Sequence, residues 1–368
     1  MLLVLLLALA HGQMLERDPA SAVLGQGEGV RPEHNPSAYV RVVERYQGGE
    51  RAAALQEIRG WRFAEMRNAL VALPRALPRA NVRVLEGAVL LHAEIGLLAL
   101  QGSQLVEAKW HFDNSRRLYE RYQGRIDERD YDLALAAAAL AFGQAETARE
   151  FVRRGLRVAP DDAEMLLLLG CVHESLAEGL DLRNRAASEE PPPDPQRSET
   201  AAARRRREEA LSRLQRGAEA ALRKALALDP DLREARLRLA HTLQVQGRLE
   251  EAEPLLRQVD EQASEERGRY LARLFRARAA EDAGRPDEAA ELYRRAVEAW
   301  PEAQAARVGL AHLLERDAGP AAARDQVAAS LASSRRDDRP ADPWWTYSYG
   351  PPGLAKTALE RVWKVLGP

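Results

Sequence analysis

The residues of this chain whose types could support metal or nucleophilic chemistry are seven histidines and one cysteine. The histidines are scattered, and none belongs to the His-Glu-x-x-His pattern that places two imidazoles on one helical face for zinc. Cys171 follows a run of leucines, which indicates a buried apolar side chain and not a reactive thiol. A single cysteine also excludes an internal disulfide. We therefore predict no metal site and no cofactor.

Motifs of enzyme active sites are also missing from the sequence. The Gly-Gln-Gly-Glu-Gly stretch at residues 25–29 lacks the Walker pattern that binds phosphates, and no Gly-x-Ser-x-Gly elbow presents a nucleophile. Carboxylates are numerous but are interspersed with arginines, as on solvated helix faces. We expect no catalytic residues, no small-molecule substrate and no enzymatic activity. Chemistry within residues 178–209 or the aromatic C-terminal stretch is the weaker alternative.

Four consecutive arginines, Arg204–Arg207, form the only basic cluster. Such a cluster could contact phosphates or an anionic membrane surface. However, Glu199 precedes it, Glu208 follows it and no aromatic residues interleave, which favours a solvated helix start. The net charge of −2 gives no electrostatic case for nucleic acid, so no nucleic-acid partner is expected.

The elements that must position these residues are helices. Hydrophobic residues make up 46% of the chain and are mostly alanine and leucine, whereas aromatic residues make up only 5%. Alanine and leucine are strong helix formers, and β-branched residues are few. The composition therefore predicts an all-α protein.

One spacing recurs along these helices. Gly284 is followed at offsets of 5, 9, 12 and 17 residues by Ala289, Tyr293, Ala296 and Pro301. The same frame begins again at Gly143 and at Gly247. Small residues at fixed positions let two helices approach closely, and the proline ends the second helix. The spacing predicts a stack of helix-turn-helix units of about 34 residues.

These residues resemble the tetratricopeptide repeat (TPR) family over roughly residues 80–335, with a weaker extension back to residue 39. The resemblance implies an α-solenoid, a right-handed superhelix of about seven helix-turn-helix repeats, with a C-terminal capping segment. It also implies a protein or peptide partner on the concave face, which the first helix of each repeat lines. Some members clamp a C-terminal carboxylate with lysine and asparagine, but Leu237 and His241, or Leu274 and Arg278, occupy those positions here.

The groove positions of the family, carried over repeat by repeat, give a set of candidate partner-binding residues. They are Leu90, Leu97, Leu133, Ala137, Leu237, His241, Leu274, Arg278 and His312. An apolar stripe of this kind could bind an amphipathic helix or an extended peptide. A register shift of one residue would move several of the leucines and alanines into the core, so the groove and core interpretations both stay open.

The repeat array is predicted to span residues 37–335, with one interruption. The interval from Pro160 to Pro230 is 70 residues, but residues 188–195 contain four prolines and cannot form a packed helix. One split repeat with an insertion therefore fits better than two repeats. We expect residues 178–209 to form a loop between the two helices of that repeat.

Aromatic residues are most concentrated beyond the array, in residues 336–368. This segment contains Trp344, Trp345, Tyr347 and Tyr349, followed by an amphipathic helix from residue 354. One interpretation is a partner-binding patch, because aromatic residues dominate binding hot spots. The other is a cap, because the end of a repeat array exposes apolar surface. The adjoining amphipathic helix favours the cap.

The N-terminus carries a short apolar run that resembles a secretory signal. Residues 1–12 are predicted to be a signal peptide, and residues 13–36 a disordered lead-in rich in glycine, proline and charge. We accordingly expect an exported, non-enzymatic scaffold of the periplasm or cell envelope. The alternative is an accessory subunit of an envelope enzyme or of a secretion or assembly complex, anchored in the membrane by an uncleaved N-terminus.

Overall fold

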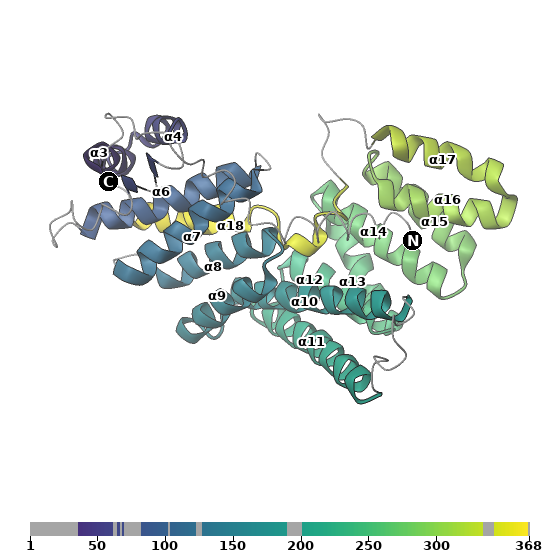
Figure 1. The fold of residues 1–368 in the computed structure, drawn as a ribbon. Coiled ribbons are helices and arrows are strands. Elements are labelled where there is room, and N and C mark those ends of the chain that lie inside the picture. Colours follow the sequence, from purple (N-terminus) through teal and green to yellow (C-terminus); the bar gives the residue numbers. More distant parts are fainter. Residues whose placement is uncertain are drawn as a thin grey trace, which may run out of the picture. The chain divides into compact units, whose positions relative to one another are not determined.

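The computed structural model of the chain describes residues 36–61, 65–66, 68–69, 82–101, 104–122, 127–189, 201–333 and 342–366. Apart from the 3₁₀ turn η2, every regular element in these ranges is an α-helix, and none is a strand, so the all-α prediction is confirmed (Figure 1). The predicted signal peptide and nearly all of the lead-in lie outside the described residues.

The described helices follow one another as pairs, in the manner of the predicted repeats. In chain order the pairs are α3 (Pro36–Gln47) with α4 (Arg51–Arg59), α6 (Val82–Gln101) with α7 (Leu105–Tyr122), α8 (Glu128–Ala141) with α9 (Ala145–Val158), α10 (Ala163–Glu189) with α11 (Ala201–Leu228), α12 (Arg233–Val245) with α13 (Leu249–Gln262), α14 (Glu266–Asp282) with α15 (Pro286–Ala299), and α16 (Gln304–Ala318) with α17 (Pro320–Ser333). The short helix η2 (Tyr347–Tyr349) and α18 (Leu354–Leu366) complete the chain.

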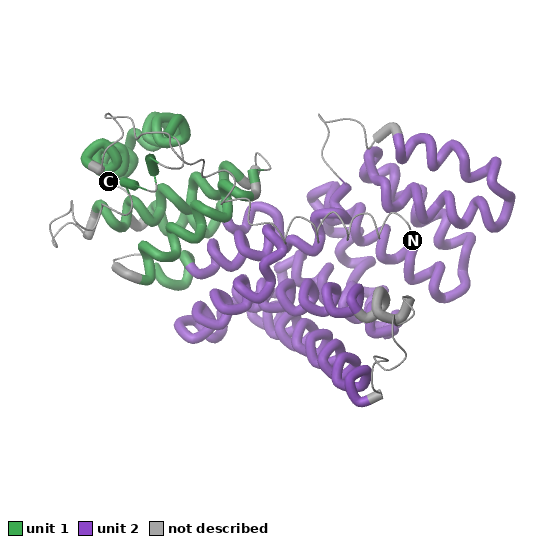
Figure 2. Tube along the Cα trace, in the orientation of Figure 1, with its two compact units in different colours: residues 1–131, 356–368 green, residues 132–355 purple. Residues whose placement is uncertain are grey.

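The helices group into two compact units (Figure 2). Unit 1 comprises residues 1–131 and 356–368, and unit 2 comprises residues 132–355. The C-terminal part of the chain is therefore divided between the units. Its aromatic stretch belongs to unit 2, and most of α18 belongs to unit 1.

The glycines that begin the recurring spacing lie in the turns between paired helices. Gly143, Gly247 and Gly284 have φ values of 69°, 77° and 70°, a region that side chains with a Cβ rarely adopt. In each turn the residue after the glycine donates its N–H to a carbonyl of the first helix, in the bonds Gln144 to Ala139, Arg248 to Leu243 and Arg285 to Ala280. This bond satisfies a carbonyl that would otherwise lack a partner at the helix end, which explains why glycine recurs there.

The remaining positions of the spacing are buried, as close helix packing requires. After Gly284 they are Ala289, Tyr293 and Ala296, each at most 2% exposed. Helix α15 then ends at Ala299, two residues before the proline of the frame. The spacing therefore marks the turn, the packed face and the end of the second helix.

The insertion in the split repeat is mostly helical, so the expected loop over residues 178–209 is wrong for most of its length. Helix α10 continues to Glu189 and α11 begins at Ala201. Residues 190–200, which contain the prolines, lie outside the described residues. The residues on either side are rich in alanine, leucine, glutamate and arginine, so helix propensity extends both helices up to the proline-rich stretch.

Candidate functional site

The first helices of successive pairs in unit 2, α10, α12, α14 and α16, contact one another in that order. We call the side of unit 2 that they form the first-helix face. Helix α12 has no exposed stripe in its middle, because residues 235–240 are all buried. Six consecutive residues exceed the roughly 3.6 residues of one helical turn, so α12 is covered on every side.

Residues 342–349, which we call the aromatic segment, contribute to this cover. The Trp344 and Tyr347 rings lie 5.8 and 5.3 Å from the Phe275 ring of α14, both edge-on. They also lie 5.8 Å from each other in a stacked arrangement. The imidazole of His241 on α12 stacks on Phe275 at 4.5 Å and meets Tyr347 edge-on at 5.1 Å. A cluster of four rings therefore joins the aromatic segment to α12 and α14.

Arg238 lies at the centre of the contact and is fully buried. Its guanidinium carbon lies 4.3 Å from the centre of the Tyr347 ring, and Nη2 donates to the Tyr347 carbonyl at 2.8 Å. The same guanidinium forms ion pairs with Glu234 at 2.8 Å and with Glu174 at 2.9 Å. The buried cation is therefore matched by two carboxylates, a carbonyl and a π face.

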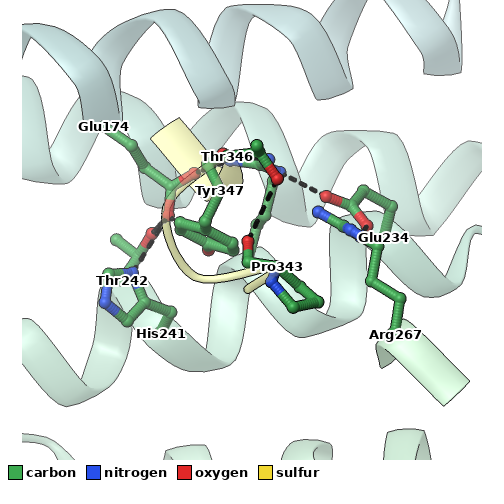
Figure 3. Close-up of polar contacts among 9 residues, drawn as sticks. Glu174, Glu234, His241, Thr242, Arg267, Pro343, Thr346 and Tyr347 are labelled. Atoms are coloured by element: carbon green, nitrogen blue, oxygen red, sulfur yellow. Dashed lines mark hydrogen bonds and ion pairs between the residues drawn. The ribbon is translucent and has the colours of Figure 1, made fainter. Parts of the chain in front are cut away.

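Glu174 of α10 receives hydrogen bonds from several elements at once (Figure 3). Besides Arg238, the Thr242 hydroxyl and the Tyr347 hydroxyl each donate to its carboxylate at 3.2 Å. His241 Nδ1 lies 3.5 Å from the same oxygen. Burial by itself would raise the pKa of this carboxyl, but the contacts with His241 and Arg238 outweigh it and the pKa is lowered. Glu174 is therefore a stable anion that binds donors.

Glu234, at the start of α12, bridges two arginines. Its carboxylate accepts from Arg238 and, at 2.8 Å, from Nη1 of Arg267 on α14 (Figure 3). Burial opposes ionisation, but the charges of Arg238 and Arg267 lower the pKa below its usual value. The ion pairs of Arg238 with Glu174 and Glu234 join α10 to α12, and the Glu234–Arg267 pair extends them to α14, without any contribution from the aromatic segment.

The two tryptophans contact α14 and α16. The guanidinium carbon of Arg278 lies 4.2 Å from the centre of the Trp344 ring. Trp345 Nε1 donates to the Gln304 side chain at 3.1 Å. Both indoles remain partly exposed.

Asp342 begins the aromatic segment and is only 3% exposed. Its carboxylate accepts from the backbone N–H groups of Gln304 and Ala305, at 2.8 and 2.7 Å. It also accepts from the Tyr270 hydroxyl at 2.7 Å and from the N–H of Trp344 at 2.9 Å. Asp342 thus supplies the acceptor that the first amides of α16 need, and its charge complements the positive end of that helix.

The structure separates the candidate groove residues into three groups. Six apolar residues are at most 9% exposed, which fits the core interpretation of their positions: Leu90, Leu97, Leu133, Ala137, Leu237 and Leu274. His241 and Arg278 contact the aromatic segment. The His312 side chain is 66% exposed on α16.

Among the four candidate aromatic residues, Trp344, Trp345 and Tyr347 contact residues of the first-helix face. Tyr349 is partly buried, and burial raises the pKa of its hydroxyl. These contacts are to α10, α12, α14 and α16, the first helices of four successive pairs.

The sequence did not single out Glu174, Arg238 or Asp342. A local signal existed for Arg238, because it follows Glu234 by four residues and precedes His241 by three, which places all three on one helical face. A signal also existed for Asp342, because an aspartate just before a proline favours a turn in which its side chain accepts backbone N–H groups. Nothing local indicated Glu174.

A second polar cluster, in unit 1, was also missed. His92 and His111 are fully buried, with their Nδ1 atoms 2.7 Å apart, and the Tyr39 hydroxyl lies 2.9 Å from His92 Nε2. Burial lowers the pKa of His92 to about 3, and burial together with His92 lowers that of His111. The pair is therefore neutral. Within the described part of the chain, no group of three or more metal-ligating residues comes together.

Comparisons with known proteins place the repeats in a family. A family model described as tetratricopeptide repeat matches residues 201–274, and a second with the same description matches residues 271–313. No curated protein matches the chain.

Several solved structures have a similar arrangement of helices. A TPR protein of Thermus thermophilus is 19% identical, with 60% of this chain and 98% of that chain covered and a TM-score of 0.39. A MamA structure is 18% identical, with 57% and 99% covered and a TM-score of 0.36. A structure of the APC/C hetero-tetramer Cut9–Hcn1 is 13% identical, with 89% and 55% covered and a TM-score of 0.48.

The matched segment 201–313 contains two of the three glycine turns, and the third follows the same geometry in α8 and α9. The helix pairs, their turns and their buried frame positions thus agree with the family models. The chain therefore contains tetratricopeptide repeats, which the family models match over residues 201–313.

Proposed function

We propose that this protein is a non-enzymatic scaffold that binds a protein or peptide partner on the first-helix face of unit 2. Tetratricopeptide repeats build protein-interaction scaffolds, and their first helices line the side on which a partner is expected. The observation that carries the proposal is that this face already binds a stretch of polypeptide, the aromatic segment, through side chains of four consecutive repeats. A surface that binds one peptide segment has the chemistry to bind another.

The first-helix face also continues past the aromatic segment onto exposed surface. On α16, Val308 is 52% exposed and the His312 side chain 66% exposed. Across from His312, Glu281 of α14 lies 3.9 Å from its imidazole. A partner can therefore reach polar and apolar side chains of the last repeats directly.

A site-specific cross-linking experiment tests this assignment. A photoreactive residue replaces His312 on α16 or, as a control of similar exposure, Arg294 on α15. In cells that make the protein, position 312 should give a discrete covalent adduct that excess unmodified protein suppresses. Equal adducts from both positions, or none from position 312 in a folded protein, would overturn partner binding on this face.

We further propose export to the periplasm or cell envelope, on the basis of the apolar run in residues 1–12. Among the helices that the structure describes, none has the length and hydrophobicity that a bilayer-spanning segment needs. Sequencing the N-terminus of the mature protein separates the two versions. A start near His11 supports the exported scaffold, and an intact Met1 in a membrane fraction supports the anchored accessory subunit.

A further inference from the structure

The aromatic segment binds to unit 2 mainly through three side chains, Asp342, Trp344 and Tyr347. Their spacing places aromatic rings two and five residues after an acidic residue. We propose that the first-helix face recognises a partner segment with this same pattern, an acidic residue followed by aromatics at the second and fifth positions. The chain's own segment occupies the site until such a partner displaces it. This inference rests on the proposed function, and it adds the chemistry of the ligand.

Part of the backbone hydrogen bonding of the aromatic segment is internal. The N–H groups of Trp345, Tyr347 and Tyr349 donate to carbonyls three residues earlier, within the segment. The Thr346 hydroxyl likewise donates to the Pro343 carbonyl at 3.3 Å (Figure 3). These bonds leave with the segment, so its release breaks backbone hydrogen bonds mainly at the N–H groups of Gln304 and Ala305 and at the Tyr347 carbonyl.

The charged groups beneath the segment stay paired without it. Arg238 keeps its ion pairs with Glu174 and Glu234 when Tyr347 leaves, and Glu234 keeps Arg267. No charge in this group then lies buried without a counter-charge, which is the condition that makes an empty site costly. The site is therefore organised before its ligand arrives.

The groups that contact Asp342 favour an acidic residue at that position of a ligand. Three arginines, Arg238, Arg267 and Arg278, lie on this surface, and the carboxylates of Glu174 and Glu234 pair with Arg238 and Arg267. The N–H groups at the start of α16, which now donate to the Asp342 carboxylate, add a partial positive charge. Each of two guanidinium groups lies over a ring, and such contacts recognise aromatic side chains.

Competition with the tethered segment sets a requirement on the partner. A segment in the same chain competes at an effective concentration on the order of 1 mM. A partner with only the same contacts would therefore displace it poorly. Exposed groups beyond the segment, Val308 and His312, supply the additional contact area that a successful competitor needs.

The test uses the full-length protein and a fluorescent peptide of residues 342–353 as the probe, with binding followed by fluorescence anisotropy. Three variants weaken the internal segment to increasing extents: Asp342→Asn, Trp344→Ala and the two combined. Peptide affinity should rise along this series, by at least tenfold over wild type for the double variant. Each single variant gives its own comparison, so the series stays informative if the double variant fails to fold.

Matched controls test whether the Trp344 ring of the peptide and Arg278 of the protein are responsible for binding. A peptide with alanine in place of Trp344 should bind about thirtyfold more weakly, as expected for a hot-spot aromatic residue. In the Trp344→Ala protein, Arg278→Gln should weaken binding of the unmodified peptide, whereas Arg294→Gln on α15 should not.

Three results would overturn the inference. The first is that the peptide binds with equal affinity to the wild type and to those variants of Asp342 and Trp344 that fold. The second is binding that ignores both the peptide substitution and Arg278→Gln. The third is a wild-type dimer that becomes monomeric on Trp344→Ala, which would assign the site to a second copy of this chain. If position 312 still cross-links a partner while the peptide fails, the scaffold function stands and only the ligand chemistry falls.

Discussion

In unit 1 the C-terminal chain packs as an α-helix, whereas in unit 2 it packs as a segment of turns that ends in the 3₁₀ helix η2. Both place an aromatic ring beside an arginine. In unit 1, Arg51 lies 5.0 Å from the Trp363 ring of α18 and pairs with Glu94 at 2.6 Å. In unit 2, Arg238 lies 4.3 Å from the Tyr347 ring and pairs with Glu174. Both contacts thus combine an arginine beside an aromatic ring with an ion pair between that arginine and a glutamate.

The apolar part differs. Helix α18 buries an aliphatic stripe of Ala358, Leu359 and Val362, each at most 2% exposed. The aromatic segment has no aliphatic stripe, and its tryptophans stay partly exposed. Aliphatic burial scales with the area removed from water and binds a helix firmly. From this difference we expect α18 to stay bound in unit 1, while the segment in unit 2 relies on contacts that another peptide could reproduce.

The largest effect is expected for Arg238→Ala. Removing this buried cation leaves Glu174 without its guanidinium partner and Glu234 with only Arg267, so the free energy of unfolding of unit 2 should fall by about 3–5 kcal/mol. Denaturant unfolding followed by hydrogen exchange of the α12 amides measures it. Arg278→Ala, which removes a partly exposed arginine, is the control and should cost about 1 kcal/mol or less. Equal losses for the two variants would contradict the central role of Arg238.

The next effect tests the permanence of α18. Leu359→Ala removes a side chain that is 2% exposed, so unit 1 should lose about 2–4 kcal/mol of stability. Hydrogen exchange in α3 and α4 should rise, and exchange in α14 and α15 should not. Lys356→Ala, at an exposed position of the same helix, serves as the control. An unchanged exchange rate in α3 and α4 would show that α18 is dispensable there.

Acid should also distinguish the units, by an amount that grows as the pH falls. Burial keeps the pKa values of His92 and His111 below 6.5, so the unfolded chain binds more protons than unit 1 once the pH falls below 6.5. Stability of unit 1 should therefore fall as the pH drops, by up to about 1.4 kcal/mol per pH unit for each histidine, and for His92 down to about pH 3.

Amide exchange in α6 and α7, compared with α14 and α15 between pH 7 and pH 5, measures this slope. His173 of α10 shifts in the same direction, so α10 is left out of the comparison. Glu174 and Glu234, with pKa values below 4.5, add their own loss only at lower pH. His92→Gln should flatten the slope in unit 1, and a slope unaffected by that change would refute its origin.

The smallest effect is expected for Tyr347→Phe. This change keeps the ring over Arg238 and removes only the hydroxyl that donates to Glu174, so unit 2 should lose about 1 kcal/mol. A peptide with the same change should bind the Trp344→Ala protein a few times more weakly than the unmodified peptide does. A loss as large as that of Arg238→Ala would mean that the hydroxyl, and not the ring, dominates the contact.

The fold could be predicted from sequence because its signals are local. Gly247 and Gly284 lie a few residues from the carbonyls that their turns satisfy, and the buried frame positions follow within two or three helical turns. The insertion was misjudged because its prolines were allowed to outweigh the helix formers on either side of them. Local patterns therefore predicted the turns and the packed faces correctly, but they predicted a loop that is too long.

The site could not be predicted in the same way. Tyr347 reaches Glu174 across 173 residues and Arg238 across 109. Such contacts depend on where the stacked repeats bring their first helices, which a single sequence does not encode in any nearby pattern. Groove positions carried over from the family reached His241 and Arg278, but they could not reveal that the chain itself contacts them.

The contact of Asp342 with α16 has a consequence for the order of synthesis. The N–H groups of Gln304 and Ala305 emerge from the ribosome before the carboxylate to which they donate. Asp342 follows them by 38 and 37 residues, respectively. At the usual rates of translation this delay is roughly 2–8 seconds. During that interval the nascent chain presents the start of α16 without its acceptor, so the repeat of α16 and α17 is finished only by polypeptide that is made after it.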